Sequence, residues 1–231
     1  MFAIRRIILT GLCSLALVLT IGFGVSAASN GKGLVALVHP NETPAKTGSG
    51  PPENAHKAFT GTPFEFDPGH TGIAAGDWVK HLGLPQDNDK NRFGLILSKN
   101  GTTPTNASAG LVVHGVKNLK LTELGFDVRN GGHCGAGAPR FNVVTSDGVT
   151  RFYGCVYGTN SPNTPAPGWQ RVRFLTNVAY PGAPAIPGGL RVTSISIDFD
   201  EGTDTGPDFS GMVVLDNVDV NGELIGGPGE S

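Results

Sequence analysis

Two aspartates that stand two residues apart are the first candidates for chemistry in this sequence. Asp198 and Asp200 alternate with Ile197 and Phe199, so in a β-strand both carboxylates lie on one face, about 7 Å apart. Paired carboxylates held roughly 5–9.5 Å apart can act as acid and base on a glycosidic bond. A strand face open to solvent offers no apolar surroundings to raise the pKa of one of them. The pattern therefore favours a solvated acidic face over a catalytic pair.

No other combination of residue types predicts a catalytic nucleophile or a histidine-based metal centre. The six histidines are scattered, and none stands at metal-ligand spacing from another. The sequence contains no Gly-x-Ser-x-Gly motif. We therefore expect a non-catalytic protein, and an exported hydrolase that uses Asp198 is the remaining enzymatic interpretation.

A predicted hairpin supplies candidates for ligand binding. Asp147-Gly148 lies between two alternating runs, 140–145 and 150–157, which is typical of a two-residue type I′ turn. With that turn, Phe141 and Phe152 face the core, and the opposite face carries planar polar and aromatic side chains of the kind that bind sugars. The predicted ligand-binding residues are Asn142, Arg151, Tyr153 and Tyr157.

The first thirty residues have the order of properties of a secretory signal peptide. Arg5 and Arg6 precede a nearly continuous apolar run, and Val25-Ser26-Ala27 places small residues before a cleavage point. We expect residues 1–27 to form a signal helix that is removed; the alternative is a membrane anchor, because the run approaches the length of a spanning helix. The remaining chain has 15 basic and 19 acidic residues. This balance, without a basic cluster, argues against nucleic acid or a membrane as partner.

Two cysteines remain after cleavage, Cys134 and Cys155. Export exposes them to oxidising conditions, which favours one structural disulfide. A metal site built from His133 and Cys134 is the alternative, but adjacent residues have poor geometry for binding a single ion. The disulfide is expected to hold the glycine-rich segment 131–139 across the outside of the sheet that carries Cys155.

The rest of the sequence indicates short strands separated by turns. Thirty-five glycines and 17 prolines punctuate runs rich in Val, Ile, Phe and Thr that alternate with a period of two. This pattern predicts an all-β fold, a two-sheet antiparallel β-sandwich (jelly roll) of eight to nine strands. The expected organisation is a signal peptide over 1–27, a flexible arm or linker over 28–59, the β-sandwich domain over 60–222 and a disordered tail over 223–231.

Four segments of the C-terminal half carry a family resemblance. They are Leu124–Arg129, Gly168-Trp169-Gln170, Ile195–Asp200 and Val214-Leu215-Asp216-Asn217-Val218. Together they resemble carbohydrate-binding modules of the galactose-binding-like jelly-roll type, over about residues 60–222. The resemblance implies a β-sandwich that binds a glycan. The segment 131–139 is not part of that family pattern.

The same resemblance implies a structural calcium ion, held by one carboxylate from the first strand and one from the last. The matching residues here are Glu65 or Asp67 and Asp216. Asp216 also shares its parity with four apolar neighbours in residues 212–220, and a carboxylate in such a setting needs a partner that a calcium ion could supply. The alternatives are a β-bulge that turns Asp216 outward and a hydrogen-bonded aspartate at a strand end.

The sequence thus predicts a secreted protein, extracellular or periplasmic, that binds a glycan or another cell-surface component without catalysis. The alternative is a structural or adhesive extracellular domain that uses calcium only for stability.

Overall fold

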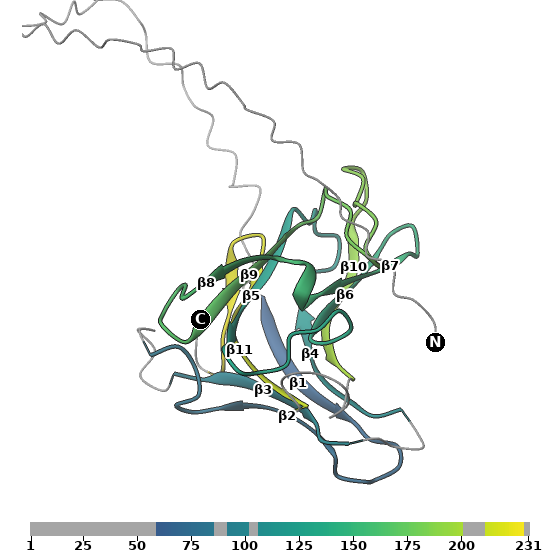
Figure 1. Cartoon of the computed structure of the whole chain (residues 1–231). Helices are drawn as coiled ribbons and strands as arrows, with labels where there is room; N and C mark the ends of the chain where they lie inside the picture. Colours follow the sequence, from purple (N-terminus) through teal and green to yellow (C-terminus); the bar gives the residue numbers. More distant parts are fainter. Residues whose placement is uncertain (1–58, 86–91, 102–105, 201–210, 229–231) are drawn as a thin grey trace, which may run out of the picture. The chain divides into compact units, whose positions relative to one another are not determined.

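The computed structural model describes residues 59–85, 92–101, 106–200 and 211–228 (Figure 1). All of these residues belong to one unit, 52–231. The predicted signal peptide and nearly all of the predicted arm lie outside the described residues. Among the residues that are described, no helix is long and apolar enough to cross a membrane.

The alternating runs fold into two antiparallel sheets, because a period of two places apolar side chains on one side of each strand. The order in the first is β1-β4-β10-β6-β7; in the second it is β2-β3-β11-β5-β9-β8, with β12 added to β11 (Figure 1). The five-stranded sheet contains β1 (Thr60–Phe66), β4 (Ser108–His114), β10 (Val192–Phe199), β6 (Arg140–Thr145) and β7 (Thr150–Gly154). The seven-stranded sheet contains β2 (Ala74–Val79), β3 (Gly94–Lys99), β11 (Met212–Val220), β5 (Glu123–Arg129), β9 (Trp169–Leu175), β8 (Thr159–Pro162) and β12 (Glu223–Ile225).

Aromatic rings from both sheets make up the centre of the main core. Phe126 of β5 stacks on Phe141 of β6 with ring centroids 5.4 Å apart, and Phe174 of β9 packs edge-on against both. Tyr153 of β7 contacts the Phe174 ring at 5.6 Å. All four side chains are fully buried, so the interlocking rings join the two sheets through apolar burial.

The predicted all-β sandwich is confirmed, with more strands than expected. The described residues contain twelve strands and a single 3-10 turn, η1 (Cys155–Tyr157). The additional strands are short or lie at sheet edges, where alternation is weak. The last of them, Glu223–Ile225, pairs with β11, so the sandwich extends into the segment predicted as a tail.

The hairpin of β6 and β7 has a different register from the predicted one. Phe141 pairs with Tyr153, one residue away from the register of a two-residue turn. The turn holds three residues, 146–148, and ends on Gly148 with φ 77°, which is typical of a type I turn followed by a bulge. Because side chains alternate, this shift places Tyr153 in the core and Phe152 on the surface. The predicted faces of β7 are therefore wrong.

Strand β11 also departs from the predicted alternation. Its pairing with β5 shifts between Asp216 and Asp219, and Asn217 at the shift has φ 46°. Val214 accordingly packs outside the main core, whereas Val218 is fully buried within it. The extra residue reverses the parity of the strand, so Asp216 lies on the outward side of the sheet, where it is 1% exposed.

Candidate functional site

The outward side of the five-stranded sheet carries exposed aromatic and polar side chains together. Phe66 is 52% exposed, Phe152 41% and Val112 39%. Leu111 and Tyr153, which alternate with Val112 and Phe152, are fully buried. Large exposed apolar side chains that stand among polar ones make this side a candidate interaction surface. We call this surface the open face and define it by Thr62, Phe64, Phe66, Ser108, Val112, His114, Arg140, Asn142, Phe152, Ser196 and Asp198.

Arg140, at the start of β6, is the most constrained side chain of the open face. Its two terminal nitrogens donate to the Oδ1 and Oδ2 atoms of Asp200 at 2.6 and 2.8 Å. The Gly137 carbonyl accepts another bond at 2.7 Å, and Asn142 Oδ1 accepts one from Nε at 3.0 Å. The guanidinium also lies over the Phe152 ring, 5.7 Å from its centroid. These contacts hold the guanidinium and the ring in one arrangement.

Two hollows meet at Arg140. One, of about 350 Å³, is mostly polar, and the other, of about 450 Å³, is mostly apolar. The polar hollow is lined by Phe66, Lys99, Asn106, Ala107, Ser108, Arg140, Asp198 and Asp200. The apolar hollow is lined by Ala136, Gly137, Arg140, Phe152, Tyr157, Pro181 and Gly182. The site therefore offers hydrogen-bonding groups on one side of Arg140 and an exposed aromatic surface on the other.

The disulfide builds one wall of the apolar hollow. Cys134 and Cys155 are bonded, with their Cα atoms 5.2 Å apart, as predicted. Cys155 is 2% exposed and packs with the core. The expectation that the bridge crosses the outside of the sheet is therefore wrong. The loop that it anchors brings the Ala136 carbonyl so close to Gly154 that a Cβ there would overlap it. Ala136 and Gly137 can thus line the hollow beside β7.

The carboxylate of Asp198 is half-buried, in contrast to the solvated environment that the sequence predicts. Burial raises its pKa, and the neighbouring charge of Asp200 adds to the effect, whereas Arg140 and a hydrogen bond from Asn142 oppose it. Lys99 closes the polar hollow by donating from Nζ to the Asp200 carbonyl at 2.7 Å. The hollow therefore combines charges of both signs within a partly desolvated setting.

The structure separates the four predicted ligand-binding residues. Asn142 lies on the open face and Tyr157 lines the apolar hollow. Arg151 is 3% exposed and donates to Asp147 at 3.0 Å, so it supports the hairpin turn. Tyr153 is fully buried, and burial raises its pKa to about 12. The expectation that Arg151 and Tyr153 share an exposed face is wrong because of the one-residue shift of β7.

Arg140 and Phe152 are the central residues that sequence reasoning missed. In the sequence, Arg140 is only the first residue of a predicted strand, and the two-residue turn places Phe152 in the core. Residues 146–148 also match a three-residue loop with glycine in its left-handed last position. Choosing that loop would have placed Phe152 outward, beside Asn142.

The three predicted metal ligands have hydrogen-bond partners within the chain. Asp216 Oδ2 accepts from the Leu84 N–H at 2.7 Å. Glu65 Oε1 accepts from the Gly76 N–H at 3.1 Å. Asp67 accepts from the N–H of Gly72 at 2.6 Å. Partial burial raises the pKa of the Asp67 carboxyl, but this bond and those from Thr71 outweigh that effect and lower the pKa.

These hydrogen bonds satisfy the three carboxylates without a cation. Within the described ranges, no group of three or more His, Cys, Asp or Glu side chains is arranged to hold a metal ion. The acidic residues 201–208 lie outside the described residues. Calcium binding stays a prediction from the sequence.

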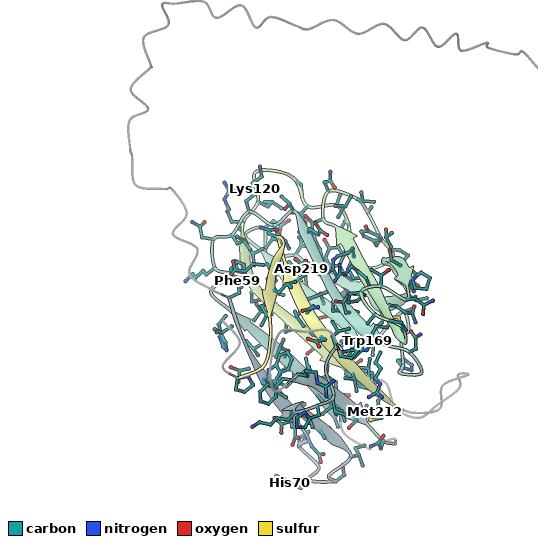
Figure 2. The ribbon with its side chains drawn as sticks, turned by 90° about the vertical axis from the view of Figure 1, so that its left-hand side faces the viewer. Phe59, His70, Lys120, Trp169, Met212 and Asp219 are labelled. Carbon is teal, nitrogen blue, oxygen red and sulfur yellow. A yellow bond between two sulfur atoms is a disulfide. The ribbon has the colours of Figure 1, made fainter. Side chains whose placement is uncertain are left out.

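The outward side of the seven-stranded sheet carries a network of paired charges around Asp127 and Arg173. Asp127 is fully buried and accepts from Arg171 at 2.9 and 3.1 Å and from Asn217 at 2.9 Å. Arg173 lies 3.6 Å from Asp219, which Figure 2 labels. Burial lowers the pKa of Arg173, and the bond to Asp127 raises that of Arg171. This network supports the fold, because its charges already satisfy one another.

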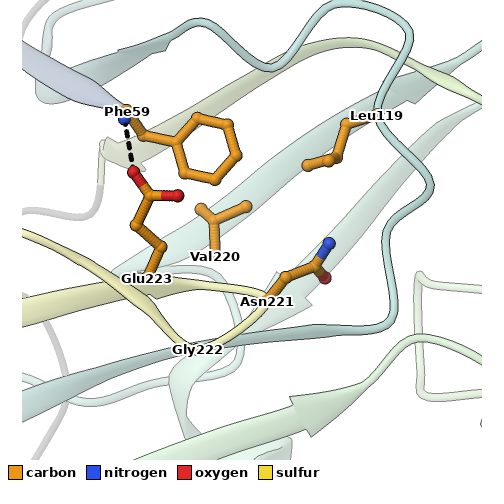
Figure 3. A pocket seen from close by; sticks show the side chains of 6 residues that line it. All are labelled: Phe59, Leu119, Val220, Asn221, Gly222 and Glu223. Atoms are coloured by element: carbon orange, nitrogen blue, oxygen red, sulfur yellow. Dashed lines mark hydrogen bonds between the residues drawn. The ribbon is translucent and has the colours of Figure 1, made fainter. Parts of the chain in front are cut away.

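A further hollow, of about 370 Å³, lies where the described part of the chain begins. Figure 3 shows the Phe59 ring, Leu119 and Val220 around it. Glu223 Oε1 accepts from the Phe59 N–H at 2.8 Å, and Asn221 Oδ1 accepts from the Thr122 N–H at 2.8 Å. The polar atoms of this hollow thus tie β1 and the residues before β5 to the turn that leads into β12.

Comparison with known proteins gives a weak structural likeness. No protein-family model and no curated protein matches the chain. A family 11 carbohydrate-binding module of the cellulosomal cellulase Lic26A-Cel5E of Clostridium thermocellum is similar at 18% identity and a TM-score of 0.36, over 72% of this chain and 88% of that one. A family 11 module from the same organism, in complex with a β-1,3-1,4-mixed-linked tetrasaccharide, has a TM-score of 0.37 at 18% identity, over 72% of this chain and 91% of that one. Both belong to the general class that the sequence resembles.

Proposed function

We propose that this protein is a secreted, non-catalytic β-sandwich that binds a glycan on its open face. The observation that carries the proposal is the meeting of an apolar and a polar hollow at one immobilised arginine, Arg140. A sugar ring presents apolar C–H groups on its faces and hydroxyls around its edge. Phe152 offers a surface for the first, and Asp198 and Asn142 offer acceptors and donors for the second.

The charges around the site favour a neutral ligand. Arg140 and Asp200 neutralise each other in a two-point ion pair, and Lys99 and Asp198 have opposite charges. Among the described residues of the site, a ligand with a net charge would meet no uncompensated partner, whereas hydroxyls can both donate to and accept from these groups. We therefore expect an uncharged oligosaccharide or polysaccharide.

Export is supported by the disulfide together with the signal-like first residues. A disulfide such as Cys134–Cys155 forms and persists in oxidising compartments. In such a compartment an extended glycan is an accessible partner.

The test is the replacement Phe152→Ala, which removes the exposed ring. Wild-type protein should be retarded in native gels that contain a neutral polysaccharide from a panel of mixed-linkage β-glucan, xyloglucan, xylan and galactomannan. We expect Phe152→Ala to weaken that binding by roughly tenfold or more, since a central aromatic residue carries much of the energy of an interface.

The matched control is Leu175→Ala. Leu175 is 54% exposed on β9, so its loss removes a similar exposed apolar side chain from the other sheet. Binding should be unchanged in this variant. Equal binding by wild type and Phe152→Ala would overturn the assignment of the face, and turnover of a glycan that Asp198→Asn abolishes would replace it with the hydrolase interpretation.

A further inference from the structure

Three basic side chains gather around a hollow on the outward side of the seven-stranded sheet. The hollow, of about 320 Å³, is lined by His81, Leu82, Gly83, Pro85, Arg92, Arg129, Pro167, Gly168 and Trp169. Arg129 is the last residue of β5 and pairs with Trp169, the first residue of β9. Trp169, labelled in Figure 2, is 4% exposed and forms a buried wall. The lining of this hollow shares no residue with the open face or with the hollow beside Phe59.

Arg92 and Arg129 differ from the arginines that support the fold. Arg140, Arg151 and Arg171 each have an aspartate partner. The side chains of Arg92 and Arg129 make no ion pair or hydrogen bond with any described residue. Arg129 is exposed and Arg92 half-buried. Two cations that make no ion pair with a described residue thus line one hollow, and such cations attract an anionic ligand.

Backbone hydrogen bonds fix the loop that carries His81. The Leu84 N–H donates to Asp216 Oδ2 at 2.7 Å, and the Gly83 N–H donates to the Arg92 carbonyl at 2.9 Å. A Cβ at Gly83 would lie 2.6 Å from Asp216 Oδ2, so only glycine fits there. The backbone at Gly83 and Leu84, which forms part of the hollow, is therefore held before any ligand arrives, and this lowers the cost of binding.

The backbone conformation of His81 and Arg92 is a second sign of a functional position. His81 has φ 66° and Arg92 has φ 44°. Residues with a Cβ rarely adopt this left-handed conformation, and such conformations concentrate at functional positions. At these two positions it accompanies side chains that line the same hollow.

We propose that this hollow is a second binding site, specific for the oxyanion of an acidic saccharide, a carboxylate or a sulfate. Arg92 and Arg129 supply charge-assisted hydrogen bonds to the oxyanion. The exposed Pro85 and Pro167 of the rim provide apolar contact for the sugar ring beside the buried Trp169. The site is independent of the glycan-binding open face and does not require that proposal to hold.

The test follows tryptophan fluorescence during titration with oligogalacturonate, with a sulfated dextran oligosaccharide and with unsulfated dextran of the same length. The sequence has two tryptophans; Trp169 lines the hollow, and Trp78 is buried in the main core. We expect saturable binding of at least one acidic ligand and none of dextran. The first two titrations distinguish a uronic acid from a sulfated sugar.

Arg92→Gln combined with Arg129→Gln should weaken acidic-ligand binding about 100-fold, roughly tenfold for each charge-assisted hydrogen bond that is removed. The single variant Arg129→Gln, which removes an exposed side chain, keeps the test valid if the double variant does not fold. The control Arg191→Gln removes the same charge from an arginine that donates to the carbonyls of Gly188 and Leu190, and should bind as wild type does.

The two sites can be told apart with the Phe152→Ala variant, which should retain its affinity for the acidic ligand. The double arginine variant should in turn retain any binding of neutral polysaccharide. Equal affinity of wild type and both arginine variants for acidic ligands would overturn the proposal, and so would equal binding of sulfated and unsulfated dextran.

Discussion

The outward faces of the two sheets use charged residues in opposite ways. On the seven-stranded sheet, Asp127 is fully buried and is satisfied by Arg171 and Asn217. On the five-stranded sheet, Asp198 and Asp200 line an accessible hollow beside Arg140. Both faces therefore carry aspartate and arginine, but only the second combines them with exposed aromatic rings.

This difference shows why residue type alone does not identify a site in a β-sandwich. A paired and fully buried aspartate contributes to the stability of the fold, because its removal leaves the donors that it satisfied without an acceptor. A paired aspartate at the surface contributes little to stability and remains accessible to a ligand. Exposure and the presence of a neighbouring aromatic ring separate the two roles.

The largest effect that tests this comparison is on stability. We expect Asp127→Ala to lower the free energy of unfolding by roughly 2–3 kcal/mol, because the Asn217 amide and the partly buried Arg171 guanidinium lose a fully buried acceptor. Urea unfolding followed by fluorescence measures the change. The matched variant Asp200→Ala, whose side chain is 40% exposed, should lose about 1 kcal/mol or less. Equal losses would show that the two faces do not differ in this way.

A smaller effect tests how the disulfide loop shapes the open face. In Gly154→Ala, the new methyl group would overlap the Ala136 carbonyl, so the loop must move away from β7. We expect a loss of about 1–3 kcal/mol, as for other overpacked positions, and faster amide exchange in residues 134–138. In the control Gly188→Ala, the Cβ would meet nothing within 4 Å. If Gly154→Ala unfolds and exchanges as wild type does, the loop does not depend on this contact.

The smallest effect concerns the pH dependence of stability at two aspartates, Asp198 and Asp147, whose pKa values are shifted in opposite directions. Burial raises the pKa of Asp198 in the folded state, so its ionisation destabilises the fold above that pKa. Asp198→Asn should therefore be more stable than wild type at pH 7, by about 0.5 kcal/mol, and the gain should vanish as the pH falls through the folded-state pKa.

Asp147 is the opposite case. A hydrogen bond from Arg151 lowers its pKa, so its carboxylate stabilises the fold above its ordinary pKa. Asp147→Asn should be less stable than wild type at pH 7, and the difference should fade as the pH drops through the ordinary pKa toward the lowered folded-state value. Unfolding curves at several pH values measure both variants, and shifts of the same sign would contradict the assignment.

Much of the fold could be predicted from local pattern. Runs with a period of two between glycines and prolines are sufficient for an antiparallel sandwich, since each strand has to bury one side. Pairing of Cys134 with Cys155 followed from the count of cysteines after cleavage. The hairpin over 140–154 followed from Asp147-Gly148 between two alternating runs.

The candidate site could be predicted only in part, because it depends on register. Asn142 was placed correctly, since β6 alternates regularly with the core residues Phe141 and Val143. Tyr153 and Phe152 were exchanged, because both a two-residue and a three-residue turn suit the same sequence. The bulge at Asn217 had the same effect on β11, reversing the side on which Asp216 lies.

The sequence by itself determined the class of fold, the disulfide and the supply of aromatic and charged residues. The tertiary structure decided which of these residues point outward and which of the charges are paired. The physical reason is the alternation of side chains along a strand: a shift of one residue reverses every side chain of that strand. Such shifts depend on packing against residues distant in the chain. Tyr153 packs against the ring of Phe174 in the core, and Phe152 therefore lies on the surface beside Arg140.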